Sequence, residues 1–185
     1  MANLSLYTVL AVVVLDSDGN RLLAKYYRRG PNAQQGRKSL KEQKKFESEL
    51  FSKTRKSSSE IILLDGQTVL FKYVNDVYFY LVGNPEENEL LLSTVLSSVV
   101  EAISILLKHN IDKRSLLDNL DMVVLALDEA IDDGIALETD PNAVAANVSK
   151  RGVDTIDMTL PNLNDQTLSD AYKQVKDRFN RALLR

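Results

Sequence analysis

The chain of 185 residues is 44% hydrophobic and 26% charged, and its formal net charge is −3. These values predict a globular protein with one main domain, large enough to bury a substantial core. The chain has one histidine and no cysteine. This composition excludes a disulfide framework, a thiolate metal site and a cysteine nucleophile, and it leaves few ways to build a nucleophile–base pair or a zinc site.

An apolar run at Val9–Leu15 is the first candidate for a membrane or signal segment. It is too short to span a bilayer, and it lacks a basic flank and a small-residue cleavage site. We expect it to be a strand, and we expect no other segment to be long and apolar enough to span a membrane. The absence of cysteine also fits a cytosolic protein.

The first elements are predicted to form a hairpin. Leu6–Leu15 and Arg21–Tyr27 are the strands, and Asp16–Asn20 is the turn between them. The turn superficially resembles the start of an EF-hand calcium loop. Arg21 stands where that loop needs glycine, however, and Tyr27 stands where it needs glutamate, so the hairpin is the preferred interpretation.

A lysine-rich helix follows the loop Gly30–Gly36. Ser39 and Glu42 have the spacing of a capping box, which predicts a helix from there to about Lys53. The segment Arg28–Lys56 carries ten Lys or Arg and three Asp or Glu, on an otherwise acidic body. It either faces an anionic membrane or an acidic neighbour, or is a solvated helix face. The candidate residues of this basic face are Arg28, Arg29, Lys41, Lys44 and Lys45.

Three further strands are predicted as a meander. Ile61–Leu64 and Thr68–Tyr73 flank Asp65-Gly66, a strong hairpin signal. Asn75-Asp76 makes the next turn, into Val77–Val82, which has no polar face and is expected to be covered on both sides.

The helix after this strand is expected to be long and largely buried. Asn84 can cap it and Pro85 suits its first position, whereas Lys108 and His109 lie at the end where the helix dipole favours cations.

The rest of the chain is predicted to be mainly helical. A short helix should run from Asp112 or Ser115 to Leu117, and a buried helix over Leu120–Ile131, with Gly134 as its C-cap. Another should start at residues 139–141. We predict a main domain over residues 1–151, a linker over 152–167 and an amphipathic C-terminal helix over 168–185, which packs on its own domain or on a partner.

Four acids near the end of the buried helix are the strongest candidates for acid–base or metal chemistry: Asp128, Glu129, Asp132 and Asp133. Their spacing would place Asp128 and Asp132 on one helix face. The alternatives are solvated acids or a surface that faces a partner rich in Lys or Arg, and we favour these. No cofactor-binding glycine motif is present, and the acidic body argues against nucleic acid.

The order of elements resembles the longin-like small subunits of vesicle coats, the adaptor complex small-subunit family. Stretches similar to the clathrin adaptor small chains are Leu23–Tyr27, Asp76–Tyr80 with Glu87–Leu90, and Leu125–Glu129 with Gly134. A more specific resemblance is to the zeta subunits of the COPI coatomer. It lies at Ser5–Val9, Asp16–Gly19, Lys41–Lys44, Ser59–Ile61 and Leu137–Pro141. The resemblance as a whole covers roughly residues 4–151.

The resemblance implies an α/β (α+β) fold: a five-stranded antiparallel sheet with helices on both faces and the first strand beside Val77–Val82 at its centre. It also implies a structural subunit, not an enzyme, that needs no cofactor and pairs with the helical trunk of the coatomer gamma subunit. The apolar surface of the long helix would then be divided between the core and this partner, with Leu91, Val95 and Val99 as candidate partner residues. With the beta and delta subunits, these two chains would form the adaptor-like half of coatomer. An Arf-type GTPase would recruit this coat to the cytosolic face of Golgi membranes, for retrograde Golgi-to-ER and intra-Golgi transport.

One departure limits what the resemblance implies. The clathrin adaptor small chains have an arginine that helps read acidic dileucine signals where this chain has Leu22, and Arg21 should lie on the opposite strand face. Cargo-signal binding is therefore not implied. Two alternatives remain: another longin-type trafficking module, such as a clathrin-type small chain or a tethering-complex subunit, and an enzyme or metal protein that uses Asp128, Glu129 and Asp132.

Overall fold

The computed structural model describes residues 6–27, 39–57 and 59–157. The chain divides after Ser149 into two compact units. The first unit contains the sheet and the helices that cover it. Of the second unit, the structure describes only the last residues of helix α5 (Pro141–Asp157).

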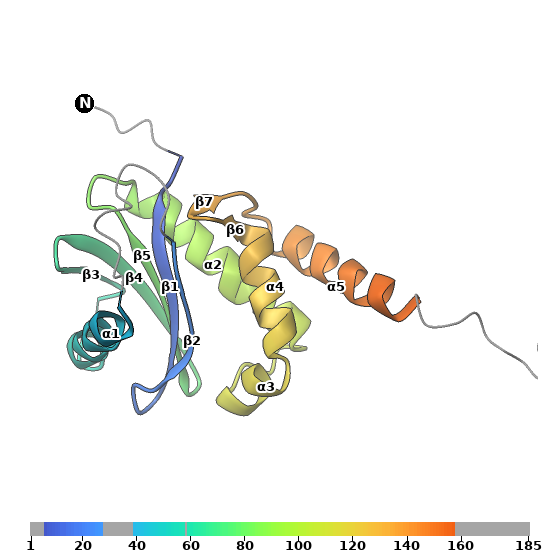
Figure 1. The fold of residues 1–185 in the computed structure, drawn as a ribbon, viewed down its shortest axis with the longest axis horizontal. Helices are drawn as coiled ribbons and strands as arrows, with labels where there is room; N and C mark the ends of the chain where they lie inside the picture. The colour runs from blue at the N-terminus through green and yellow to red at the C-terminus, as the bar shows by residue number, and fades with distance from the viewer. Residues whose placement is uncertain (1–5, 28–38, 58, 158–185) are drawn as a thin grey trace, which may run out of the picture. The chain divides into compact units, whose positions relative to one another are not determined.

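A five-stranded antiparallel sheet lies at the centre of the first unit (Figure 1). The strand order β2-β1-β5-β4-β3 places β5 in the middle with β1 beside it, as the resemblance implied. Strands β1 and β5 are rich in β-branched and aromatic residues, and nearly all their side chains are buried. The strands are β1 (Val9–Asp16), β2 (Arg21–Tyr26), β3 (Ile61–Leu64), β4 (Gln67–Val74) and β5 (Val77–Gly83).

Tight turns set the register of the meander. Asp65 and Gly66 both have positive φ, +53° and +69°, between the paired residues Leu64 and Gln67. Positive φ at both central residues is the requirement of the type I′ hairpin turn that Asp-Gly favours, so the predicted hairpin is confirmed. Asn75, at φ +54°, turns the chain between β4 and β5, again as predicted.

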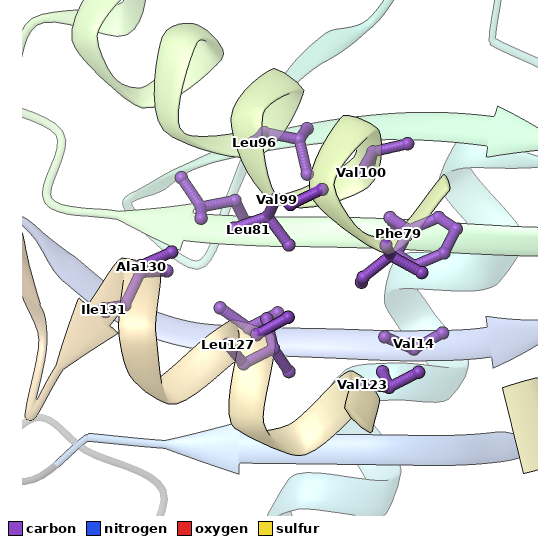
Figure 2. Packing of buried hydrophobic residues seen from close by; sticks show 14 of the residues in the cluster. Val14, Phe79, Leu81, Leu96, Val99, Val100, Val123, Leu127, Ala130 and Ile131 are labelled. Carbon is purple, nitrogen blue, oxygen red and sulfur yellow. The ribbon is translucent and has the colours of Figure 1, made fainter. Parts of the chain in front are cut away.

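Helices cover both faces of the sheet (Figure 1). The helix α1 (Leu40–Thr54) packs Phe46 and Leu50 on one face. On the other face, α2 (Glu89–Leu106) and α4 (Leu120–Ala130) pack together over β1 and β5 (Figure 2). The remaining helix, α3 (Lys113–Asp118), leads into α4.

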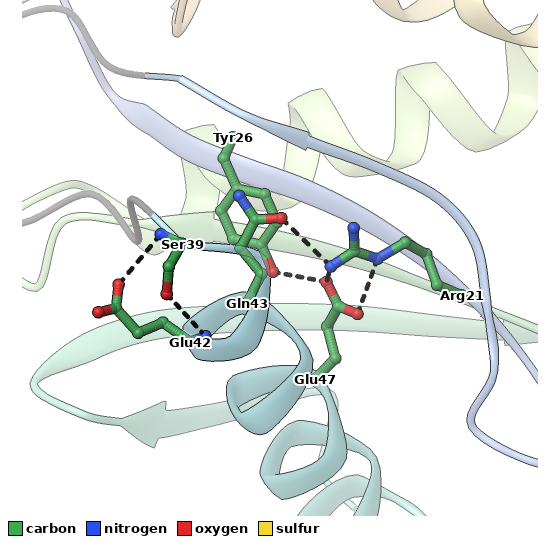
Figure 3. Close-up of polar contacts among 6 residues, drawn as sticks. All are labelled: Arg21, Tyr26, Ser39, Glu42, Gln43 and Glu47. Carbon is green, nitrogen blue, oxygen red and sulfur yellow. Dashed lines mark hydrogen bonds and ion pairs between the residues drawn. The ribbon is translucent and has the colours of Figure 1, made fainter.

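A partly buried ion pair holds α1 on the sheet (Figure 3). Arg21 donates from Nε and Nη2 to the two carboxylate oxygens of Glu47, at 2.9 and 2.6 Å. The Tyr26 hydroxyl donates to the same carboxylate at 2.7 Å, and Gln43 Oε1 accepts from Arg21 at 3.3 Å. The Glu47 side chain is only 5% exposed, so this network ties α1 to β2 inside the protein.

Ser39 caps α1 as the sequence predicted (Figure 3). Its hydroxyl accepts from the Glu42 N–H at 3.2 Å, and the Glu42 carboxylate accepts from the Ser39 N–H at 3.3 Å. Both donors would otherwise lack an intrahelical partner, which is why this pairing specifies where the helix starts.

The long helix starts later than predicted. Asn88, not Asn84, caps α2, because the Asn88 side chain accepts from the Leu90 N–H at 2.9 Å. Residues 84–87 form a turn, closed by the Glu87 N–H on the Asn84 carbonyl. After this turn, the Leu92 side chain packs directly on Gly83, where a Cβ atom added to the glycine would lie 2.4 Å from the leucine.

The predicted C-terminal cations of α2 lie beyond the helix. Lys108 and His109 have φ of +55° and +63°, so the chain leaves the helical conformation after Leu107. The His109 N–H donates to the Ser104 carbonyl at 2.7 Å, while its ring lies 3.2 Å from the Ser104 hydroxyl. The backbone of His109, and not its ring, therefore satisfies a terminal carbonyl.

The prediction of Gly134 as a helix C-cap is wrong. Helix α4 ends at Ala130, and the next residues form a small hairpin of β6 (Ile131–Asp132) and β7 (Ile135–Ala136). Gly134, at φ +94°, lies in its turn, where a Cβ atom would come within 2.6 Å of the Val9 carbonyl. The Val9 N–H donates to the Gly134 carbonyl at 3.0 Å, so the hairpin is held against the start of β1.

The linker predicted over residues 152–167 begins inside a helix, because α5 continues to Asp157. The rest of that segment and the C-terminal helix predicted over 168–185 lie outside the described residues. The helix start near Pro141 is confirmed, with the Asp140 carboxylate accepting from the Asn142 N–H at 3.0 Å.

Within the described residues, one helix, α2, has the length and apolar composition of a membrane-spanning helix, contrary to our expectation from the sequence. Length and composition are weak evidence, because the core helix of a globular domain passes the same test. Here eight of the 18 residues of α2 are buried in the core. This packing accounts for its apolar composition.

The turn between β1 and β2 holds a buried carboxylate, Asp16. Burial alone would raise the pKa of Asp16. Hydrogen bonds from the Lys113 ammonium at 2.8 Å, from the Asn20 side chain and from the backbone N–H groups of Asn20 and Asp18 outweigh it and lower the pKa to about 2. These bonds make the segment a closed hairpin turn and join α3 to the sheet.

We expect the free energy of unfolding to rise from about pH 2 to pH 4, because the unfolded chain still binds the proton that folded Asp16 has released. The Lys113 side chain is 45% exposed, so solvent screens the pair and the rise should be smaller than the full pKa shift of Asp16 would give. Urea denaturation at several pH values should show a flatter pH dependence for Asp16→Asn. The neighbouring exposed Asp18→Asn is the control, and equal slopes for both variants would contradict this account.

Candidate partner-binding surface

The apolar residues predicted to face a partner differ in exposure. Val95 and Val99 are 0% and 1% exposed and belong to the core between α2, the sheet and α4, so their assignment to a partner surface is wrong. Figure 2 shows Val99 pointing into this core. Leu91 is 39% exposed, and its neighbour Leu90 is 77% exposed. The apolar surface that α2 leaves uncovered therefore lies at its first turn.

Acidic residues surround this first turn. Glu86 and Glu89 are exposed and Glu87 is half-buried. Partial burial raises the pKa of Glu87, and the nearby charge of Glu86 acts in the same direction. Exposed leucines beside carboxylates suit a partner surface that is apolar at its centre and basic at its edge.

Asp128 and Asp132 do not share a helix face, because α4 ends at Ala130 and Asp132 lies in β6. The structure nevertheless brings both acids near one cation. The Lys25 ammonium of β2 forms an ion pair with Asp128. Burial lowers the pKa of Lys25, and the charges of Asp132 and Asp133 oppose that shift. The Asp128 carboxylate thus already has a partner in this chain, Lys25, whereas the Asp132 side chain remains exposed.

The structure gives the acids no common metal-binding geometry. Glu129 accepts from the Asn147 side chain at 2.8 Å, so it joins α4 to α5. Among the residues that the structure describes, no group of three or more His, Asp or Glu is placed to hold a metal ion. The arrangement around Asp128 links elements of the fold.

The basic face is partly described. Lys41, Lys44 and Lys45 are exposed on α1, on the side away from its buried residues. Lys45 forms a weak ion pair with Glu49 at 3.8 Å, and Lys44 borders a surface cleft of about 560 Å³ beside the β1–β2 turn. Arg28 and Arg29 lie outside the described residues.

The two residues at the departure from the clathrin adaptor pattern lie on opposite sheet faces, as expected. Arg21 binds Glu47 on the α1 side. Leu22 packs against the apolar cluster under α2 and α4. The Arg21 side chain therefore stabilises the contact between β2 and α1.

Sequence reasoning missed two exposed apolar residues on an edge strand. Ile61 and Leu63 of β3 are 43% and 67% exposed. An apolar run of four residues looks like a buried strand. The available signal was its shortness after a polar connector, which is typical of an edge strand.

Comparison with known proteins agrees with this fold. Residues 8–155 match the family model described as the clathrin adaptor complex small chain. A chain of the AP-3 complex, from a homology model of the full-length complex in a stretched open conformation, has the same fold. That chain matches with a TM-score of 0.57 at 19% identity, covering 83% of this chain and 99% of that one.

More specific relatives match along nearly the whole chain. Coatomer subunit zeta-1 of Bos taurus and of Homo sapiens are each 44% identical over 181 residues, covering 98% of this chain and 96% of the relative. Coatomer subunit zeta of Saccharomyces cerevisiae is 40% identical, covering 99% and 98%. The chain therefore belongs to the clathrin adaptor complex small chain family and, within it, to the coatomer zeta subunits.

Proposed function

We propose that this protein is a structural subunit of the COPI vesicle coat. The observation that carries the proposal is the 44% identity to coatomer zeta subunits across 98% of this chain. The competing interpretation, a clathrin-type small chain or a tethering subunit, rests on less specific similarity, such as the 19% identity to the AP-3 chain.

The work of the protein is assembly. It pairs directly with the trunk of the coatomer gamma subunit, and through it with the beta and delta subunits. An Arf-type GTPase in its GTP state brings the assembled coat to the cytosolic face of Golgi membranes, for retrograde and intra-Golgi transport. The chain makes and breaks no bond and needs no cofactor. Its location is then the cytoplasm and the surface of coated vesicles.

A reconstitution tests this proposal. Coatomer assembled with this chain should bind Golgi-like liposomes when a GTP-loaded Arf-type GTPase is present, and binding should fall when the GTPase holds GDP. Coatomer prepared without the chain should lose its gamma subunit or bind poorly. Equal recruitment with and without the chain would contradict the proposal.

The basic face supports a finer proposal, that Lys41, Lys44 and Lys45 face an anionic membrane or an acidic coat neighbour. Reversing all three to glutamate should weaken recruitment severalfold, and more at low salt than at high salt, because exposed charges are screened. Liposome co-sedimentation at two salt concentrations measures this effect. The control reverses the exposed Lys108, Arg114 and Lys150. Unchanged recruitment would identify the lysines as a solvated helix face.

A further inference from the structure

A groove lies between the edge strand β3 and helix α2, with a volume of about 270 Å³. Its apolar lining comes from Ile61, Leu70 and Phe71 on the sheet and from Leu96 on the helix, and Ser93 also lines it. Leu70 and Leu96 are 3% and 2% exposed and form the floor. The groove is therefore an opening onto the main hydrophobic core.

Exposed apolar residues extend this groove toward the start of α2. Leu63 follows Ile61 by two residues on β3, so both point to the same sheet face. Leu90 precedes Ser93 by three residues, so both lie on one side of α2. Leu63 and Leu90 are 67% and 77% exposed. We call this surface the β3–α2 groove, and it comprises Ile61, Leu63, Leu70, Leu90, Ser93 and Leu96.

The edge of β3 is closed to an added strand at Ile61. The register of the β3–β4 hairpin points the N–H and carbonyl of Ile61 away from β4, because Leu64 pairs with Gln67 across the two-residue turn and bonded pairs alternate. The Ser59 hydroxyl accepts from this N–H at 3.3 Å and donates to this carbonyl at 2.9 Å. At this end of β3 a partner would therefore bind through side chains, as a helix in a groove does.

Charge around the groove selects among partners. Glu86, Glu87 and Glu89 flank Leu90 in the sequence, and Glu60 lines the groove itself. Among the described residues, Lys72 is the one basic residue of the lining. An anionic membrane would be repelled by these carboxylates. A second copy that docked through the same surface would bring a single lysine toward four carboxylates. A basic partner surface balances these charges.

We propose that the β3–α2 groove receives an amphipathic helix of the large coat chain, with apolar side chains over Leu63, Leu70 and Leu90 and with Lys or Arg beside Glu86, Glu87 and Glu89. This inference rests on the proposed function, which supplies a helical partner chain. It adds the surface of this chain that the partner covers and the chemistry of the covering helix.

The test uses the full-length chain and the immobilised trunk of the coatomer gamma subunit. Leu90→Glu should weaken binding at least about tenfold, since it places a charge at the centre of an apolar contact. It should leave the fold intact, because Leu90 is exposed and an acid is favourable in the first turn of a helix. Leu63→Gln, on the opposite wall, should also weaken binding.

Leu40→Glu is the matched control. Leu40 is 58% exposed in the first turn of α1, on the other sheet face, so this variant makes the same change in the first turn of another helix. It should bind within about twofold of the wild type. Glu86→Lys should weaken binding mainly at low salt, and Glu101→Lys, at an exposed position farther along α2, should not.

The outcomes separate this inference from the proposed function. If the wild-type chain does not bind the trunk, the proposed function fails. If the wild type binds and Leu90→Glu and Leu63→Gln bind equally well, only the groove assignment is overturned. A dimer of the wild-type chain that dissociates with Leu90→Glu would assign the groove to a second copy and would also overturn it.

Discussion

Replacing Arg21 by alanine is expected to lower the free energy of unfolding by about 3 kcal/mol or more. The variant leaves the Glu47 carboxylate, 5% exposed, without its bidentate cation. Tyr26 can donate one hydrogen bond to this carboxylate but cannot neutralise its charge. Guanidinium denaturation monitored by circular dichroism measures the loss.

A double variant separates the ion pair from the packing at this site. Arg21→Met with Glu47→Leu removes both charges and keeps side chains of similar volume, so it should be markedly more stable than Arg21→Ala. Arg114→Ala is the control, because Arg114 is 92% exposed and lies 3.6 Å from Asp118. It should change stability by less than about 0.5 kcal/mol. A cost for Arg21→Ala as small as this control would show that the Arg21–Glu47 pair does not hold α1 on the sheet.

Phe79→Ala in the central strand is expected to cost about 3 to 5 kcal/mol, because it removes a fully buried ring and leaves a cavity. Phe79 is 1% exposed and lies in the cluster beneath α2 and α4 (Figure 2). This loss is a large part of the stability of a typical domain. Thermal unfolding should therefore show a strongly lowered midpoint, and the variant should also bind a partner chain poorly at physiological temperature.

The neighbouring residue provides a matched comparison on the other sheet face. Tyr80→Phe keeps the ring and removes only the hydroxyl, which lies 2.8 Å from Thr54 Oγ1. Thr54 still donates to the Leu50 carbonyl at 2.9 Å, so this change should cost only about 1 kcal/mol. Equal losses for Phe79→Ala and Tyr80→Phe would contradict the assignment of Phe79 to the main core.

Local signals predicted the elements whose geometry is itself local. Asp65-Gly66 demands positive φ at two successive residues, and Ser39 with Glu42 forms a cap within one turn. The conformation at these two places follows from neighbouring residues and does not depend on contacts with distant parts of the chain. The meander and the start of α1 were predictable for this reason.

Two boundaries depended on tertiary contacts that the sequence does not display. Asn84 and Asn88 can each cap a helix, and the packing of Leu92 on Gly83 selects the later one. Gly134 suits a helix C-cap and a hairpin turn equally well. The Gly134 carbonyl accepts a hydrogen bond from the Val9 N–H in the hairpin, and the sequence does not show that these distant residues meet.

The candidate surface was predicted only in outline. An apolar helix that the sheet and α4 cover on different sides has no periodicity that separates core from partner residues. Val95 and Val99 were therefore assigned to the wrong surface, while Leu91 was assigned to an exposed one. The β3–α2 groove depends on the position of β3 at the edge of the sheet, which follows from the strand order.

The most direct test of the central claim is co-expression of the full-length chain with the trunk of the coatomer gamma subunit, followed by size-exclusion chromatography with light scattering. If the protein is a COPI zeta-type subunit, the two chains should elute as a one-to-one complex, and the complex should unfold at a higher temperature than either chain alone. If the trunk elutes without this chain, and the chain alone is a stable monomer, the account is wrong.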